Sequence, residues 1–212
     1  MPHIIAIDGP AGAGKSTVAQ LVSERLGLPV LDTGSLYRAV GWAAIQEGVD
    51  STDDTACGEL IRRIKIEILG PGRVAVNGQD ISVEIRTPEV TAESSRVAAH
   101  PIVHELLLGL QRDYGQKMNC VVEGRDIGTV VFPNATLKIY LTADEAVRYQ
   151  RAAQAHGKGV AKHNAERDKR EATRTVSPMV PAEDAVYLDS TDMSLEEVVN
   201  LIVGLFRKQV PE

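Results

Sequence analysis

Short apolar runs alternate along the chain with stretches whose apolar residues recur every three to four positions. Residues 3–7 form an apolar run that ends at Asp8-Gly9-Pro10, and residues 15–26 have helical spacing closed by Gly27. Further strands are expected at 30–31, 120–123, 137–141 and 185–188, and further helices at 36–45, from Thr87-Pro88 to His100, and after Pro101. Strands that alternate with helices predict a parallel sheet flanked by helices.

Residues 62–85 have a different pattern of polar and apolar positions from the rest of the chain. Residues 65–68 and 73–76 alternate polar and apolar positions, and Gly70-Pro71-Gly72 and Asn77-Gly78 follow them. Alternation punctuated by turn residues is typical of antiparallel hairpins. We therefore predict a small antiparallel β insertion, separate from the main sheet.

Helix starts are marked by capping residues. Thr87 precedes a proline, the combination expected at an N-cap followed by the first helical position. Thr142 with Glu145, and Ser194 with Glu197, have the spacing of capping boxes and predict two more helix starts.

Length and composition narrow the class of protein. A chain of 212 residues with 43% hydrophobic residues is expected to form one domain with a sizeable core. It has no apolar run of the roughly 20 residues that span a bilayer and no pattern of a secretory signal, so we expect a cytoplasmic protein. Cys57 and Cys120 are far apart and are expected to be reduced thiols.

Charge is unevenly distributed. The formal net charge of -6 argues against a general nucleic-acid binder, yet residues 148–174 carry eight Lys or Arg against three Asp or Glu. A basic island on an acidic chain suits a small polyanion better than a long phosphate backbone. His156 and His163 lie in this stretch and are expected to be exposed polar residues.

The segment from Gly9 to Ser16 matches the phosphate-binding pattern G-x-x-x-x-G-K-[ST] at every position. Glycines let backbone amides approach phosphate oxygens, and the following helix directs its N-terminus at the anion. The lysine supplies a charge for the β- and γ-phosphates, and the serine hydroxyl can ligate Mg²⁺. The predicted ATP-binding residues are Gly9, Pro10, Ala11, Gly12, Ala13, Gly14, Lys15, Ser16 and Thr17, with Ser16 as the Mg²⁺ ligand.

The phosphate loop is compatible with three classes of protein: a kinase, a GTP-driven switch, and an ATPase that performs mechanical or nucleic-acid work. The chain has no N-K-x-D motif of a guanine-specific switch, and its short length and basic island favour a kinase. A glycine turn without a ligand is the structural alternative.

Three further blocks carry a family resemblance: residues 32–38 (DTGSLYR), residues 123–133 (EGRDIGTVVFP), and the segment holding E-R-D, T-R and V-S-P between 166 and 178. With the phosphate loop, they resemble the bacterial cytidylate kinase family over nearly the whole chain. The resemblance implies transfer of the γ-phosphoryl group of ATP to CMP or dCMP. With the Mg²⁺ expected at the phosphate loop, we expect a monomer, and the charge and the lack of a membrane-spanning run predict that it binds neither nucleic acid nor membrane.

The same resemblance implies an organisation. The core comprises about 1–34, 116–145 and 184–212, and the monophosphate-binding part about 35–115, with the β insertion at about 62–85. A mobile helical lid is expected at about 146–176.

Site residues follow from the resemblance position by position. Lys15, Arg125 and Arg174 are the expected catalytic residues, and the expected CMP-binding residues are Thr33, Tyr37, Arg38, Ser95, Arg125, Asp126, Arg167, Glu171 and Arg174. Several guanidinium forks can neutralise the charge between donor and acceptor.

Each of these positions also has a purely structural reading. Arg38 could lie on a solvated helix face, Tyr37 could be core, and Ser95 could bond back to its own helix. Arg125 could pair with Asp126, and Arg148 and Arg151 could reach ATP or only solvate a helix.

The chain departs from the family pattern at three places. His104 stands where arginine is usual, and an imidazole offers one donor and one acceptor instead of a fork, which leaves the base contacts there open. Glu171 stands where aspartate is common near the sugar, and residues 148–166 form a shortened segment. Asp32 could hold a Mg²⁺-bound water or simply cap the next helix.

The expected mechanism is in-line transfer without a dedicated base, since a phosphomonoester with a second pKa of about 6 is mostly dianionic at neutral pH. Three rival functions stay open: a kinase for UMP or a non-nucleotide metabolite, a nucleotide-binding regulatory protein without transfer activity, and an RNA-binding protein that uses residues 148–174.

Overall fold

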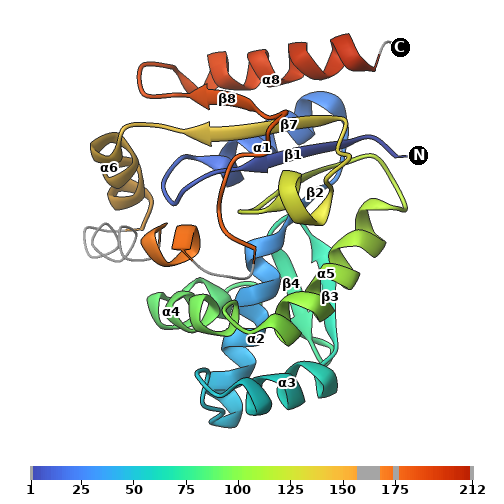
Figure 1. Cartoon of the computed structure of the whole chain (residues 1–212), viewed down its shortest axis with the longest axis vertical. Coiled ribbons are helices and arrows are strands. Elements are labelled where there is room, and N and C mark those ends of the chain that lie inside the picture. The colour runs from blue at the N-terminus through green and yellow to red at the C-terminus, as the bar shows by residue number, and fades with distance from the viewer. Residues whose placement is uncertain (1, 157–167, 174–176, 211–212) are drawn as a thin grey trace. The chain divides into compact units, whose positions relative to one another are not determined.

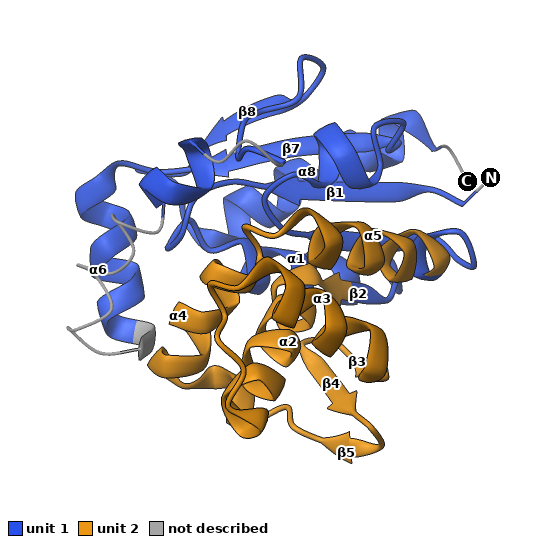
Figure 2. Cartoon of the chain, turned by 60° about the horizontal axis from the view of Figure 1, so that its bottom comes forward, with its two compact units in different colours: residues 1–30, 114–212 blue, residues 31–113 orange. Residues whose placement is uncertain are grey.

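The computed structural model describes residues 2–156, 168–173 and 177–210 (Figure 1). The chain separates into two compact units, which Figure 2 distinguishes by colour. Unit 1 comprises residues 1–30 and 114–212, and unit 2 comprises residues 31–113.

A five-stranded sheet forms the centre of unit 1, with the strand order β2-β6-β1-β7-β8. Its strands are β1 (Ile4–Asp8), β2 (Val30–Asp32, where the chain enters unit 2), β6 (Cys120–Glu123), β7 (Leu137–Thr142) and β8 (Val186–Asp189). β1 pairs in parallel with both β6 and β7, and β7 pairs in parallel with β8. The predicted parallel sheet is confirmed.

Two helices cover one face of this sheet: α1 (Lys15–Leu26) and α8 (Leu195–Gln209). Ile5, Ile7 and Ile139 point to that face because alternate residues of a strand share a side, and they are buried with Val22 of α1 and Ile202 of α8. The core is mostly aliphatic, with Phe206 as its one aromatic residue among the buried residues described. It fixes the position of the loop that joins β1 to α1.

Helix ends in unit 1 follow the capping chemistry with one exception. Gly27 ends α1 in a left-handed conformation, and Ser194 and Glu197 form the predicted capping box at the start of α8. The box expected at Thr142 is wrong, because Thr142 is the last residue of β7 and α6 (Glu145–His156) begins only at Glu145. The spacing matched, but the backbone at Thr142 is still engaged in the sheet.

Unit 2 is mostly helical. Its elements are α2 (Thr33–Glu47), α3 (Asp54–Arg63), η1 (Glu84–Arg86), α4 (Pro88–Val97) and α5 (Pro101–Gly115, which ends in unit 1). Thr87 caps α4 as predicted, its side chain accepting from the N–H of Val90. α2 packs closely on α4, and a Cβ at Gly41 would lie 2.8 Å from the backbone nitrogen of Ser94.

The start of α2 differs from the prediction. The helix begins at Thr33 instead of residue 36, because the Asp32 carboxylate caps it by accepting from the N–H of Ser35. The Asp-Thr-Gly sequence therefore opens a helix, although it has the composition of a turn. Gly48 ends α2 as expected.

The predicted β insertion is confirmed as a separate antiparallel sheet of three strands, β3 (Ile66–Gly70), β4 (Arg73–Val76) and β5 (Gln79–Asp80). The first turn holds Gly70 and Gly72, and the second holds Asn77 and Gly78, all with positive φ.

The structure also bears on membrane-spanning helices and on the two cysteines. Within the described ranges, no helix combines the length and apolar character needed to cross a membrane. Cys57 in unit 2 and Cys120 in unit 1 are buried free thiols.

Candidate active site

The phosphate loop of unit 1 runs from the buried end of β1 to the first turn of α1. Gly9, Gly12 and Gly14 adopt φ values of 144°, 75° and 92°, a region that side chains rarely enter. A Cβ on Gly9 would lie 2.0 Å from the carbonyl oxygen of Leu141, and one on Gly12 would lie 2.4 Å from that of Arg148. All three glycines are therefore favoured by conformation, and Gly9 and Gly12 are also required by space, whereas nothing lies within 4 Å of a Cβ at Gly14.

Lys15 and Ser16 open α1, where helix N–H groups favour an anion. The Lys15 side chain is buried, and its ammonium donates to the carbonyl of Pro10 at 2.9 Å, so it lies along its own loop. The Ser16 hydroxyl donates to Glu123 Oε1 at 2.7 Å, and Glu123 is the buried last residue of β6. A hydroxyl and a carboxylate thus meet at the carboxyl ends of adjacent strands.

Arg148 and Asp168 hold the middle of the loop. Asp168 Oδ1 accepts the N–H of Ala11 at 2.8 Å, and Arg148 donates to Asp168 Oδ2 at 2.6 Å and to the carbonyl of Ala11 at 2.7 Å. Arg148 is buried, so the reading as a helix-solvating residue is wrong. Arg151, on the same helix, bonds Ser190.

Arg125 lies on the turn after β6 and pairs with Glu171 through its Nε, both side chains being largely buried. Its Nη1 also donates to the carbonyl of Gly9 at 3.1 Å. Burial alone would lower the pKa of the guanidinium, but the Glu171 carboxylate holds that pKa above its ordinary value. Arg125 stays charged, with its fork placed against the start of the phosphate loop.

Asp8 lies beneath this turn. Its carboxylate accepts the N–H groups of Ile127 at 2.8 Å and Gly128 at 2.7 Å, which belong to a short π-helical turn, η2 (Ile127–Val131). Burial raises the pKa of Asp8 to about 6, against the lowering effect of the two N–H groups.

In unit 2, four residues named in the sequence analysis form two pairs, Asp32 with Arg38 and Tyr37 with His104, and we call these four residues the side-chain cluster. Arg38 donates to Asp32 Oδ2 at 2.7 Å, and the two side chains are 18% and 12% exposed, so Arg38 is not a solvated face residue. The Tyr37 hydroxyl and His104 Nδ1 are 2.8 Å apart, and the rings are stacked at 27°. His104 is buried.

The remaining predicted residues are distributed over both units. Thr33 is buried at the start of α2, Ser95 is half-buried on α4, and Asp126 is buried beside Arg125. Arg167, Arg174 and His163 lie outside the described residues, as does much of the predicted lid.

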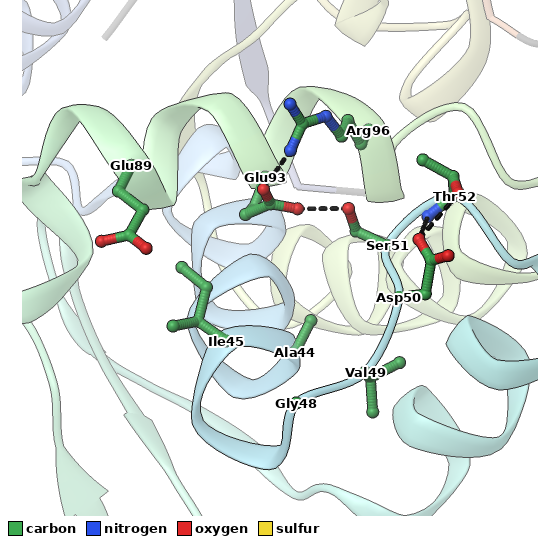
Figure 3. A pocket seen from close by; sticks show the side chains of 10 residues that line it. All are labelled: Ala44, Ile45, Gly48, Val49, Asp50, Ser51, Thr52, Glu89, Glu93 and Arg96. Carbon is green, nitrogen blue, oxygen red and sulfur yellow. Dashed lines mark hydrogen bonds and ion pairs between the residues drawn. The ribbon is translucent and has the colours of Figure 1, made fainter.

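A separate pocket of about 440 Å³ lies in unit 2 (Figure 3). Its lining residues are Ala44, Ile45, Gly48, Val49, Asp50, Ser51, Thr52, Glu89, Glu93 and Arg96, none of which was predicted for the site. Glu93 bonds Ser51 across it and Arg96 on its own helix, α4, and Asp50 bonds Thr52. Apart from Glu89, the charged residues that line it bond other lining residues, and the phosphate loop, with its complete motif, is the stronger candidate site.

Sequence reasoning missed three carboxylates that the structure brings to the phosphate-loop region: Asp8, Glu123 and Asp168. Their partners lie 119, 107 and 157 residues away in the chain. Asp8 and Glu123 each end a buried apolar run, and that position at the carboxyl edge of a parallel sheet was the available signal.

A family model described as cytidylate kinase matches residues 5–208. The chain belongs to the cytidylate kinase family. The resemblance found in the three sequence blocks is thereby confirmed.

Relatives of this family differ in length. The chain is 44% identical to the cytidylate kinase of Solibacter usitatus (strain Ellin6076), covering 98% of this chain and 93% of that protein. It is 46% identical to the bifunctional pantoate ligase/cytidylate kinase of Prochlorococcus marinus (strain MIT 9303), covering 99% of this chain and 46% of that protein. The chain therefore spans about half the length of such bifunctional relatives.

Solved structures support the fold. A gluconokinase from Sinorhizobium meliloti 1021 matches with a TM-score of 0.50 and 16% identity, covering 98% of this chain and 93% of that one. At this identity the likeness concerns the fold alone.

Proposed function

We propose that the chain transfers the γ-phosphoryl group of ATP to CMP or dCMP, giving ADP and CDP or dCDP. The observation that carries the proposal is the phosphate loop, with its glycines in left-handed conformations, in a chain that belongs to the cytidylate kinase family. Family membership favours this reading over a kinase for another acceptor or a regulatory nucleotide-binding protein.

Residues 9–17 bind the ATP phosphates through backbone N–H groups, and Lys15 adds a full positive charge. The oxygens of Ser16 and Glu123, 2.7 Å apart, are of the kind that Mg²⁺ prefers, so this pair fits a Mg²⁺ site. Bound Mg²⁺ would neutralise charge on the phosphates.

On the acceptor side, the family resemblance favours Arg38, Arg125 and Arg174 for the CMP phosphate, and Arg167 and Glu171 for the sugar. By the same resemblance, Thr33, Ser95 and Asp126 contact the cytosine, and Tyr37 packs beside the nucleotide. Arginine suits these positions because its planar fork bonds two phosphate oxygens at once.

The chemistry asks little of a protein base. The acceptor phosphate, with a second pKa of about 6, is already a dianionic nucleophile at neutral pH. The remaining task is to bring two anions together in line, and the arginines and Lys15 provide the charge for it.

The test is ADP formation by the purified chain with ATP, Mg²⁺ and each nucleoside monophosphate in turn. Stimulation by CMP and dCMP is the expected result. Equal stimulation by UMP would retain a kinase with relaxed base selection, for which His104 is the first residue to vary. If no monophosphate stimulates, the proposal fails.

Lys15→Ala tests the phosphate loop within this proposal. Loss of the buried ammonium should reduce kcat/KM by roughly 10³-fold, since charge stabilisation in the transition state is lost. Lys208→Ala, on the exposed last turn of α8, is the matched control and should retain wild-type turnover. Near-normal turnover of Lys15→Ala would contradict the assignment.

A further inference from the structure

Asp8 connects the two parts of the site that unit 1 contains. It is the last residue of β1, it is 4% exposed, and the first glycine of the phosphate loop follows it. Both of its oxygens are used by the turn after β6, Oδ1 by the N–H of Ile127 and Oδ2 by the N–H of Gly128.

These two N–H groups open the helical turn η2, and the first N–H groups of a helix have no partner within it. The residue directly before a helix normally caps them with its side chain. Asp126 holds that place and makes no side-chain capping bond. Asp8 caps the turn instead, from 119 residues away in the sequence.

We propose that Asp8 is a positioning residue for the acceptor: by capping η2 in place of Asp126, it fixes the turn that carries Arg125 and Asp126. This inference rests on the proposed function, in which those two residues bind CMP. It assigns Asp8 no contact with either nucleotide.

Neighbouring hydrogen bonds attach the turn after β6 to consecutive residues at and directly after the end of β1. Gly124 donates its N–H to the carbonyl of Ile7 at 3.0 Å, and Arg125 donates to the carbonyl of Gly9 at 3.1 Å. The Asp8 carboxylate holds the turn between these two points. The turn is also closely packed, because a Cβ at Gly128 would lie 3.1 Å from Lys138 Cδ and 3.4 Å from Asp8 Oδ2.

The two-acceptor geometry is specific to a carboxylate. Asparagine has nearly the same shape but offers one acceptor and one donor, so its NH₂ group would face a backbone N–H. One amide of the turn would then lose its partner. Asp8→Asn should therefore displace the turn while leaving the glycine conformations of the phosphate loop unchanged.

The experiment compares wild type, Asp8→Asn and a matched control, Asp50→Asn, by steady-state kinetics and amide hydrogen exchange. Asp50 is a suitable control for the exchange of carboxylate for amide, because it lies in unit 2 outside the predicted site and its Oδ1 alone accepts both the N–H and the hydroxyl of Thr52. An amide oxygen can retain both bonds, so this variant changes the charge without removing a partner. In Asp8→Asn, we expect KM for CMP to rise about tenfold and KM for ATP to change less than about twofold, with faster exchange over residues 124–131.

Asp50→Asn should leave all three quantities at wild-type values. Unchanged exchange over residues 124–131 in Asp8→Asn, or an equal rise of KM for both nucleotides, would overturn the proposal. A third outcome is that exchange is faster in Asp8→Asn but CMP does not stimulate ADP formation by the wild type. The cap would then stand, but the proposed function, and with it the acceptor role of Asp8, would be refuted. Should Asp8→Asn not fold, Asp8→Ser, whose hydroxyl accepts one N–H, should give a smaller rise of KM for CMP, and no rise there would overturn the proposal.

Discussion

The phosphate loop of unit 1 and the side-chain cluster of unit 2 are built in opposite ways. The loop is shaped by backbone, with glycines at 9, 12 and 14 in conformations that other residues rarely adopt. The cluster is made of side chains, an Asp32–Arg38 ion pair and a Tyr37–His104 contact.

This difference determines how each region responds to substitution. A backbone site fails as a whole when one residue forces a different conformation, because every N–H group moves with the chain. A side-chain site loses one interaction at a time, so its defects are graded. We therefore expect steep effects in the loop and modest ones in the cluster.

Gly12→Ala is expected to have the largest effect in this comparison. The new methyl group would lie 2.4 Å from the Arg148 carbonyl oxygen at a φ of 75°, so the loop must shift. A displacement of about 1 Å can cost about 10²-fold in rate, and we expect kcat/KM for ATP to fall by at least about that factor.

Gly27→Ala separates strain from displacement. Its φ is 66°, but nothing lies within 4 Å of the added Cβ. It should lower the free energy of unfolding by about 1 kcal/mol and leave turnover unchanged. Equal activity losses in the two variants would show that backbone strain, and not the position of the loop, is responsible.

Asp8 gives the loop region a dependence on pH. The folded chain raises the pKa of Asp8 from its ordinary value of 3.8 to about 6 through burial, so it binds the proton more tightly than the unfolded chain. The free energy of unfolding should therefore fall as pH rises from about 4 to about 6, by about 3 kcal/mol, with no further contribution from Asp8 at higher pH. Urea unfolding of wild type and Asp8→Asn at several pH values checks this, since the difference between them isolates Asp8. A constant difference would contradict it.

The contrast between backbone-built and side-chain-built regions also explains how much of each could be predicted from the sequence. The phosphate loop, the parallel sheet and the β insertion could be predicted because glycine spacing, apolar runs and turn residues are local signals. The start of α2 could be predicted only in part: the sequence leaves open that Asp32 caps the next helix, which the bond to Ser35 confirms, but the turn-like composition of Asp-Thr-Gly places the first helical residue too late. The partners of Asp8, Glu123 and Tyr37 also escaped prediction, because only the fold brings those residues together.

Arg38→Lys tests whether the cluster responds in a graded way. Lysine retains the charge but loses the planar fork that bonds Asp32 and, in our proposal, the CMP phosphate. We expect KM for CMP to rise about tenfold with KM for ATP unchanged. Arg63→Lys, at an exposed pair with Glu47 in the same unit, should change neither constant. A loss as steep as that of Gly12→Ala would refute the contrast between the two regions.

Tyr37→Phe should have the smallest effect. It removes the hydroxyl that lies 2.8 Å from Nδ1 of the buried His104 but retains the stacked ring. The lost hydrogen bond should lower the free energy of unfolding by about 1 kcal/mol, and we expect KM for CMP to rise about threefold because the imidazole is less firmly oriented. Tyr187→Phe is the control, because Tyr187 is 63% exposed on β8 and its ring stacking on Tyr140 does not need the hydroxyl. An unchanged KM for CMP together with lower stability would mean that the Tyr37–His104 pair supports unit 2 and takes no part in selecting the acceptor.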